Sequence, residues 1–407
     1  TQFVMAYSGT SGWLPTSISG GDGSGIDLTM NYDDGGRLHD WRQVGGSSSA
    51  VFEYDAADRL QAASYYDGDD PATDPLLARL SWGYTDGGLR DALGNGVPGD
   101  TLEDTFGYDV AGRLISATHE HTSNDDEAYS YDEAGNRYID GSESQYLYDD
   151  ANQLREDPRY TYTYDANGSR QTRTARAAGA RTEYHYDSEN RLIRVTLPSS
   201  DNVHFAYDPL GRLVEKVDES AAETRRYLYD GDEVLAEFDA AGSMVRRYVT
   251  TDGIDMLLGV ISGGAHYIAG TDPLGTVIGF IHAGGGAAGS YQYQAFGAIA
   301  NEDGGIANER TFAGREYERS TDLYHFRARF YDPNTGQFLQ RDPLVYKAAS
   351  KPYAYAGNNP TNYRDPYGLN EGEFAAFAGL FNKRVVEPLV QRGVGDAFAQ
   401  IPNIPHH

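Results

Sequence analysis

The stretch Phe205-Ala-Tyr-Asp-Pro-Leu-Gly-Arg-Leu213 is the clearest copy of a unit that recurs along this chain of 407 residues. Residues before the aspartate alternate as in a β-strand. The aspartate opens a turn because its carboxylate accepts backbone N–H bonds, and the glycine tolerates a left-handed backbone. Arg-Leu then begins a return strand, with leucine on one face and arginine on the other. The unit therefore predicts a β-hairpin.

The Tyr-Asp pair at the centre of this unit repeats at intervals mostly near twenty residues, and Tyr84-Thr85-Asp86 and Phe238-Asp239 are variants of it. Internal repetition at this period signals an array, and such hairpins can pair edge to edge into one long, twisting sheet. We interpret the repeated Tyr and Asp as scaffold, through cross-strand packing and turn chemistry. The pairs begin at Tyr32, Tyr54, Tyr108, Tyr131, Tyr148, Tyr164, Tyr186, Tyr207 and Tyr229.

The composition favours strands over helices, since the chain has 32 Tyr and 48 Gly. The absence of cysteine excludes a disulfide framework. A net charge of -28 opposes binding to nucleic acid or anionic lipid heads. No run of 18 apolar residues occurs, so we expect no membrane span.

Few motifs indicate a metal or cofactor. The pair in His119-Glu-His121 is expected to be solvated at a strand edge, and the acidic clusters 67–70 and 125–127 lack calcium-loop spacing. The glycine-rich piece Ala283 to Gly289 is read as a hairpin loop. We therefore expect neither a cofactor nor a metal.

The segment from Thr311 to Leu369 contains F-R-A-R-F-Y-D-P-N-T-G-Q-F-L-Q-R-D-P, then Y-A-Y-A-G-N-N-P-T-N-Y-R-D-P-Y-G-L. Its pieces, in this order, resemble the core that closes proteins of the RHS (rearrangement hot spot) or YD-repeat family. The resemblance extends from about Tyr32 to Leu369. It implies an all-β fold in which YD-repeat hairpins form a spiralling, shell-like sheet closed by the core.

This resemblance divides the chain into four parts. Residues 1–240 are the repeat array, 241–310 are degenerate repeats, 311–369 are the core, and 370–407 are a tail. In the tail, Phe374, Phe377 and Phe381 follow helical spacing, which predicts a short C-terminal helix.

The resemblance also implies an aspartyl autoprotease that cuts after the leucine of D-P-x-G-L. Carried over by position, the two carboxylates are Asp342 and Asp365, the supporting arginine is Arg329, and the scissile bond is Leu369–Asn370. Two carboxylates brought close cannot both ionise easily, so one can activate water while the other donates a proton. A guanidinium nearby would hold a charged oxygen in place.

Asp-Pro is also an ordinary turn opener, and the chain holds eight such dipeptides, so the dipeptide alone indicates nothing about catalysis. The chain departs from the family pattern at Val345, where glycine is usual, and at Lys351-Pro352, which replaces an asparagine. Neither departure is expected to contact a proposed catalytic group.

Two functions remain open. The first is a self-cleaving carrier shell for toxin delivery, secreted or displayed at the cell surface. Its partners would be its own C-terminal segment or an enclosed cargo, with further RHS modules of a longer chain. The second is a non-catalytic extracellular scaffold or adhesion module, in which Leu369–Asn370 stays intact. Neither is a turnover enzyme.

Overall fold

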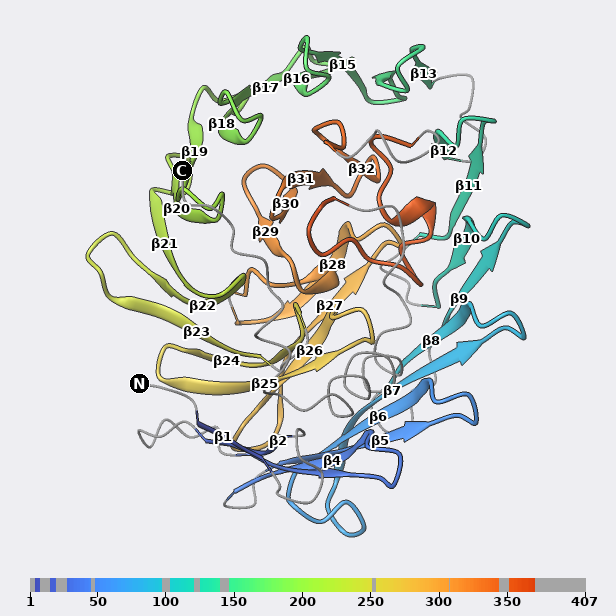
Figure 1. Ribbon diagram of the computed structural model, residues 1–407, viewed down its shortest axis with the longest axis vertical. Coiled ribbons are helices and arrows are strands. Elements are labelled where there is room, and N and C mark those ends of the chain that lie inside the picture. The colour runs from blue at the N-terminus through green and yellow to red at the C-terminus, as the bar shows by residue number, and fades with distance from the viewer. Residues whose placement is uncertain are drawn as a thin grey trace, which may run out of the picture.

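The computed structural model describes residues 4–7, 15–19, 28–44, 48–96, 103–120, 125–139, 146–250, 254–306, 308–343 and 351–369. Two long antiparallel sheets, together called the wall, curve around a small inner sheet (Figure 1). The all-β, shell-like fold expected from the sequence is confirmed. The helix expected after Leu369 lies outside the described residues.

The first sheet of the wall has twelve strands, and each pairs with the next strand in the chain. They are β1 Val4–Tyr7, β2 Pro15–Ser19, β3 Leu28–Tyr32, β4 Leu38–Gln43, β5 Ser49–Tyr54, β6 Leu60–Tyr66, β7 Leu76–Tyr84, β8 Arg90–Gly96, β9 Glu103–Tyr108, β10 Leu114–Thr118, β11 Glu127–Tyr131 and β12 Arg137–Ile139.

The second sheet continues this meander through sixteen strands. They are β13 Leu147–Tyr148, β14 Leu154–Glu156, β15 Tyr160–Tyr164, β16 Arg170–Ala175, β17 Arg181–Tyr186, β18 Leu192–Thr196, β19 Asn202–Tyr207, β20 Leu213–Asp218, β21 Glu223–Asp230, β22 Glu233–Phe238, β23 Met244–Thr250, β24 Leu257–Ser262, β25 Ala265–Thr271, β26 Val277–His282, β27 Ala287–Tyr293 and β28 Ile299–Gly304. The loop expected over 283–289 is shorter than predicted, because β27 already begins at Ala287.

The inner sheet belongs to the plug, by which we mean the described residues 311–343 and 351–369. Its strands are β29 Glu316–Glu318, β30 Leu323–Phe326, β31 Arg329–Asp332 and β32 Gln337–Phe338. Short 3₁₀ turns lie at η2 Phe312–Gly314 and η4 Ala356–Asn358. No helix among the described residues has both the length and the apolar composition that crossing a bilayer requires.

Each repeat forms the predicted hairpin, and the β17–β18 turn is representative. The carboxylate of Asp187 accepts the backbone N–H groups of Glu189 and Arg191 at 2.9 Å each, and its second oxygen accepts Arg191 Nε at 2.7 Å. Asn190 has the left-handed φ of 64° that the turn needs. Local sequence therefore satisfies the whole turn.

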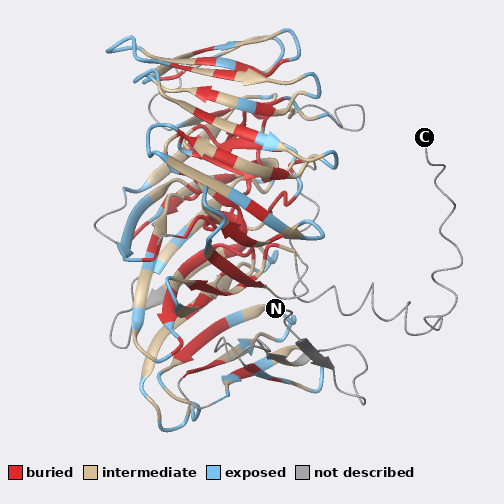
Figure 2. Ribbon diagram, turned by 90° about the vertical axis from the view of Figure 1, so that its left-hand side faces the viewer, coloured by how far each residue is buried: buried red, intermediate tan, exposed pale blue. Residues whose placement is uncertain are grey.

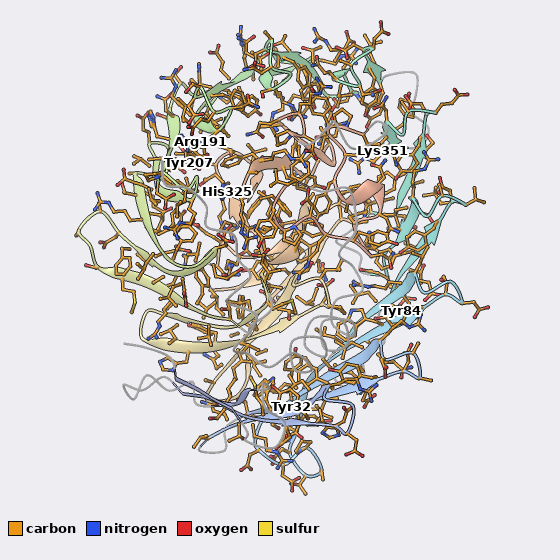
Figure 3. All side chains as sticks on the ribbon, in the orientation of Figure 1. Tyr32, Tyr84, Arg191, Tyr207, His325 and Lys351 are labelled. Carbon is orange, nitrogen blue, oxygen red and sulfur yellow. The ribbon has the colours of Figure 1, made fainter. Side chains whose placement is uncertain are left out.

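The repeated tyrosine links one hairpin to the next. The hydroxyl of Tyr207 donates to the carbonyl of Leu192 on the preceding hairpin at 2.6 Å, and the guanidinium of Arg191 stacks on the Tyr207 ring, 4.9 Å from its centre. The same stacking occurs in other repeats. Figure 3 shows Arg191 and Tyr207 side by side, with His325 of the plug near the same ring. The scaffold interpretation of the Tyr-Asp pairs agrees with these contacts.

A β-bulge recurs where the tyrosine begins each turn. The register shifts between His185 and Tyr186 and between Ala206 and Tyr207, and equivalent shifts occur in most other repeats. A bulge bends its strand and increases the local twist. Its repetition gives a physical reason for a sheet that curls around a centre instead of lying flat.

Buried residues are interspersed with less buried ones along the wall strands, and exposed residues gather at the hairpin turns (Figure 2). Trp41, Tyr65 and Trp82 of the first sheet pack against the end of the second sheet, where Val249 and Ile268 lie. Elsewhere, wall residues pack against the plug, and the plug has its own aromatic cluster of Phe312, Tyr324, Phe326, Tyr331, Phe338 and Tyr355. The interior is thus closed by contacts between distant parts of the chain.

The expectation that His119 is solvated was wrong. This residue is buried, with Nε2 2.9 Å from Glu127 and Nδ1 3.1 Å from Asp104. Burial lowers the pKa of His119, but the two carboxylates outweigh it and raise that pKa to about 9. The reason is tertiary: the strand ending at Thr118 is flanked on both sides by strands that carry carboxylates.

Candidate functional site

Arg329, on β31 of the plug, lies between the two predicted aspartates. Its Nη2 atom is 3.1 Å from Asp342 Oδ2 and 3.2 Å from Asp365 Oδ2. Because both oxygens lie within about one hydrogen-bond length of the same nitrogen, the two carboxylates lie close together at one end of the guanidinium. The structure therefore brings together all three residues that the sequence analysis named.

The environment of this trio is dry. The side chains of Arg329 and Asp365 are 2% and 1% exposed, whereas that of Asp342 is 10% exposed. The guanidinium also stacks on Phe338 at 3.7 Å. Burial lowers the pKa of Arg329, and the charges of Asp342 and Asp365 counteract this. The arginine stays charged at neutral pH and offsets the desolvation of its partners.

The backbone of the predicted cleavage segment contacts the same groups. Leu369 N–H donates to Asp365 Oδ1 at 3.0 Å, and Arg329 Nε donates to the carbonyl of Gly368 at 2.5 Å. Gly368 N–H closes the turn on the carbonyl of Asp365 at 3.1 Å. The chain up to Leu369 is thus fastened against one carboxylate, while Asn370 lies outside the described residues.

Gly368 fits this place because of its backbone. Its φ is +64°, and a Cβ added there would lie 2.5 Å from the carbonyl oxygen of Phe326. A side chain would therefore push the turn away from β30 and β31. Packing of the turn against the inner sheet is what reveals this clash with Phe326.

One further residue, Pro352, contacts the trio and was not predicted from the sequence. The carbonyl of Pro352 accepts Asp342 N–H at 2.9 Å and Arg329 Nη1 at 3.3 Å. The expectation that Lys351-Pro352 avoids the proposed catalytic groups was therefore wrong for Pro352. Its missing N–H is irrelevant here, because only its carbonyl is used. Val345 lies outside the described residues.

Arg327 supports the turn from the other side. Its Nη1 donates to the carbonyl of Pro366 at 2.5 Å and to Asp255 Oδ2 at 2.9 Å, and its guanidinium stacks on Tyr367. Asp255 is fully buried and also pairs with Arg315 at 2.6 Å. Burial raises the pKa of Asp255, but the surrounding arginines outweigh this and hold it far below its usual range. In the sequence, only the alternation in Phe-Arg-Ala-Arg indicated that Arg327 could lie near the site together with Arg329.

The arrangement is suited to acid–base chemistry on a backbone amide. It offers two carboxylates of unequal exposure, a shared guanidinium, and a peptide segment held against one carboxylate. Across the described residues, His, Asp and Glu side chains form no group of three that could hold a metal ion.

The wall and plug together define a YD-repeat shell. The sequence profile described as Teneurin YD-shell matches residues 95–365, and the chain belongs to this family. The family resemblance drawn from the sequence is thereby confirmed.

Two known proteins are similar in sequence to this chain. The chain is 30% identical over 321 residues to double-stranded DNA deaminase toxin A of Burkholderia cenocepacia (strain H111), which covers 71% of this chain and 22% of that protein. It is 26% identical to the probable deoxyribonuclease RhsA of Dickeya dadantii (strain 3937), covering 85% of this chain and 24% of that protein.

A solved structure shows the same fold. The crystal structure of TcdB2-TccC3-TEV aligns with a TM-score of 0.62 at 16% identity, covering 90% of this chain and 21% of that one. The chain thus spans less than a quarter of the length of each of these proteins.

Proposed function

We propose that this chain is the shell-closing part of a toxin carrier and that it cuts itself once, between Leu369 and Asn370. The observation that carries the proposal is the single guanidinium of Arg329 within 3.2 Å of both Asp342 and Asp365, with Leu369 N–H on the second carboxylate. The relatives named as toxins supply the context.

Contacts around the two aspartates favour different roles. Asp365 accepts Leu369 N–H with one oxygen and Arg329 with the other, which favours its charged form and its orientation. Asp342 is the more exposed of the two, so water reaches it more readily.

In the proposed reaction, a water molecule adds through its oxygen to the carbonyl carbon of Leu369. The ionised carboxylate takes a proton from that water, and the protonated carboxyl donates to the carbonyl oxygen. Collapse of the tetrahedral adduct breaks the Leu369–Asn370 bond and passes a proton to the amine of Asn370. The products are a new carboxylate at Leu369 and a free amine, and no other reactant is required.

The proposed partners follow from this reaction. The segment after Leu369, or a longer cargo in its place, would be freed from the shell by the cut. We further propose that the carrier acts outside the cell that makes it. The net charge of -28 supports this, because an acidic surface avoids nucleic acid and anionic lipid.

Intact mass of the purified chain tests the proposal. We expect a fragment ending at Leu369 that accumulates in the wild type and is lost, by at least about a hundredfold in rate, in Asp342→Asn and in Asp365→Asn. The matched control is Asp208→Asn, because Asp208-Pro209 opens a similar turn away from the site. This control should cleave at the wild-type rate.

A wild-type chain that remains whole after long incubation at neutral and mildly acid pH contradicts the proposal. In that case the chain acts as a non-catalytic extracellular scaffold. Cleavage that persists in both aspartate variants would show that another site performs it.

A further inference from the structure

The segment between the two aspartates follows the turns of the wall. Tyr353 Oη donates to the carbonyl of Gly168 at 2.7 Å, Asn358 Nδ2 to that of Gly135 at 2.8 Å, and Asn359 Nδ2 to that of Gly112 at 2.7 Å. Asn362 Oδ1 accepts the N–H of Arg90 at 2.5 Å. Gln153 Nε2 of the β13–β14 turn donates to Tyr353 Oη at 3.2 Å. We call residues 351–362 the rim segment, since they contact the five hairpins from β7 to β16.

The contacted glycines occupy the same position in their hairpins. In the β9–β10 turn, the aspartate at 109 accepts the N–H groups of Ala111, Gly112 and Arg113. These bonds within the turn leave the carbonyl of Gly112 to accept from outside, and Asn359 supplies the donor. The rim segment thus binds glycine carbonyl groups that take up this position only after the hairpin has closed.

These contacts span long stretches of chain. Tyr353 and Gly168 are 185 residues apart, and Asn362 and Arg90 are 272 residues apart. Such pairs form only when the intervening hairpins are folded and curved into place, because closing so long a loop costs entropy that local contacts do not repay.

The rim segment is joined directly to the site. Pro352, next to Tyr353, holds the backbone of Asp342 and the guanidinium of Arg329. Beyond the other end of the segment, Arg364 donates to the carbonyl of Leu274 in the β25–β26 turn at 3.0 Å. Both aspartates are therefore flanked by residues that are bound to the wall.

We infer that the rim segment makes self-cleavage depend on closure of the wall, with Tyr353, Asn358, Asn359 and Asn362 as positioning residues. This inference rests on the proposed self-cleavage. A carboxylate pair that is displaced by about an ångström loses much of its rate. Until the hairpins from β7 to β16 are in place, Asp342 and Asp365 are not held at Arg329, so the cut follows enclosure.

Refolding the full chain from urea and following the Leu369 fragment by intact mass tests the inference. Tyr353→Phe removes one hydroxyl and keeps the ring, and we expect cleavage about fivefold slower, the equivalent of one hydrogen bond. The double variant Asn358→Ala/Asn359→Ala should be at least about tenfold slower. The pH profile of cleavage should not shift, because the carboxylates are unchanged.

Tyr54→Phe is the matched control. Its hydroxyl makes the same kind of bond, to the carbonyl of Leu38 at 3.0 Å, on a hairpin that the rim segment does not contact. We expect this variant to cleave at the wild-type rate, so that general weakening of the wall is separated from loss of positioning.

Backbone hydrogen exchange gives a readout that does not need cleavage. In the Asp342→Asn background, Tyr353→Phe should make the amides of Gly368 and Leu369 exchange about fivefold faster, whereas Tyr54→Phe should not. If the wild type never cleaves but this change is seen, the proposed function fails and the positioning role stands. Unchanged cleavage together with unchanged exchange in Tyr353→Phe overturns the inference.

Discussion

At the scale of single residues, one side chain separates a structural turn from the candidate site. Asp208 and Asp365 both open an Asp-Pro-x-Gly turn with the same backbone bonds. Four residues after Asp208 stands Arg212, whose Nε binds the aspartate at 2.8 Å. Four residues after Asp365 stands Leu369, so that carboxylate pairs with the distant Arg329 instead.

Two other buried turns also begin with an aspartate that has no arginine four residues later. Asp272 has threonine at the fourth position and pairs with Arg90 at 2.8 Å, and Asp332 pairs with Arg170 at 2.6 Å. Both pairs join the turn to a part of the chain more than 150 residues away. In these two buried turns, an aspartate without its own arginine therefore joins distant parts of the chain.

The first prediction at this scale concerns Gly368→Ala. The added Cβ meets the carbonyl of Phe326 in a backbone conformation with positive φ, so the turn must shift and Leu369 must move from Asp365. We expect cleavage at least about tenfold slower, measured by intact mass over time. The control Gly211→Ala has positive φ but open space around the new Cβ, and it should cleave normally. Equal rates for both variants would contradict this.

At the scale of the hairpin, the aspartate accounts for both the turn and its acid sensitivity. Burial raises the pKa of Asp187, but hydrogen bonds from Arg191 and Glu189 outweigh this and lower it. Asp33, Asp55, Asp109 and Asp208 are shifted in the same direction by the same kind of contacts. Because the folded pKa lies below the unfolded one, this stabilisation is present above the unfolded value, near pH 4, and is lost as the pH falls through the folded value.

We therefore predict that Asp187→Ala lowers the free energy of unfolding by about 1 to 3 kcal/mol at pH 7, from two lost backbone bonds and an exposed ion pair. Urea denaturation from pH 7 to pH 3 should show the gap between wild type and variant shrinking below about pH 4. Asp201→Ala, at an exposed carboxylate, should change the stability by less than about 0.5 kcal/mol. If the difference in free energy of unfolding between wild type and Asp187→Ala stays constant with pH, the role given to the Asp187 carboxylate is contradicted.

At the scale of the whole molecule, buried charges join the wall to the plug. Lys216 on β20 lies 2.7 Å from Glu318 of the plug and 3.0 Å from Glu309, and its side chain is 5% exposed. Burial raises the pKa of Glu318, which Lys216 counteracts. Removing the lysine would take away the cation beside Glu318 and would leave Glu309 with Arg246, whose Nη1 lies 3.8 Å away.

We predict that Lys216→Met costs about 3 to 5 kcal/mol at neutral pH, because breaking a buried ion pair leaves an uncompensated charge. The cost should decrease toward mildly acid pH as the carboxylates take up protons. Arg226→Met is the matched control: its pair with Glu215 at 2.7 Å is exposed, so less than about 1 kcal/mol is expected. Thermal denaturation of both variants measures these two costs. Similar losses of stability would show that the buried pairs of Lys216 contribute no more than the exposed pair of Arg226.

The sequence by itself determined the hairpins, their order and the members of the candidate trio. A turn such as 187–191 is closed by bonds between residues at most four positions apart, so a short window of sequence contains its physics. It did not reveal the burial of His119, the contact of Pro352 with the trio, the role of Arg327 or the course of the rim segment. Those depend on which hairpin meets which after the bulges have curved the sheet. Only the tertiary structure decided that Arg329 lies between Asp342 and Asp365, because these residues are 13 and 36 positions apart and meet through the folding of the plug and not through any local pattern.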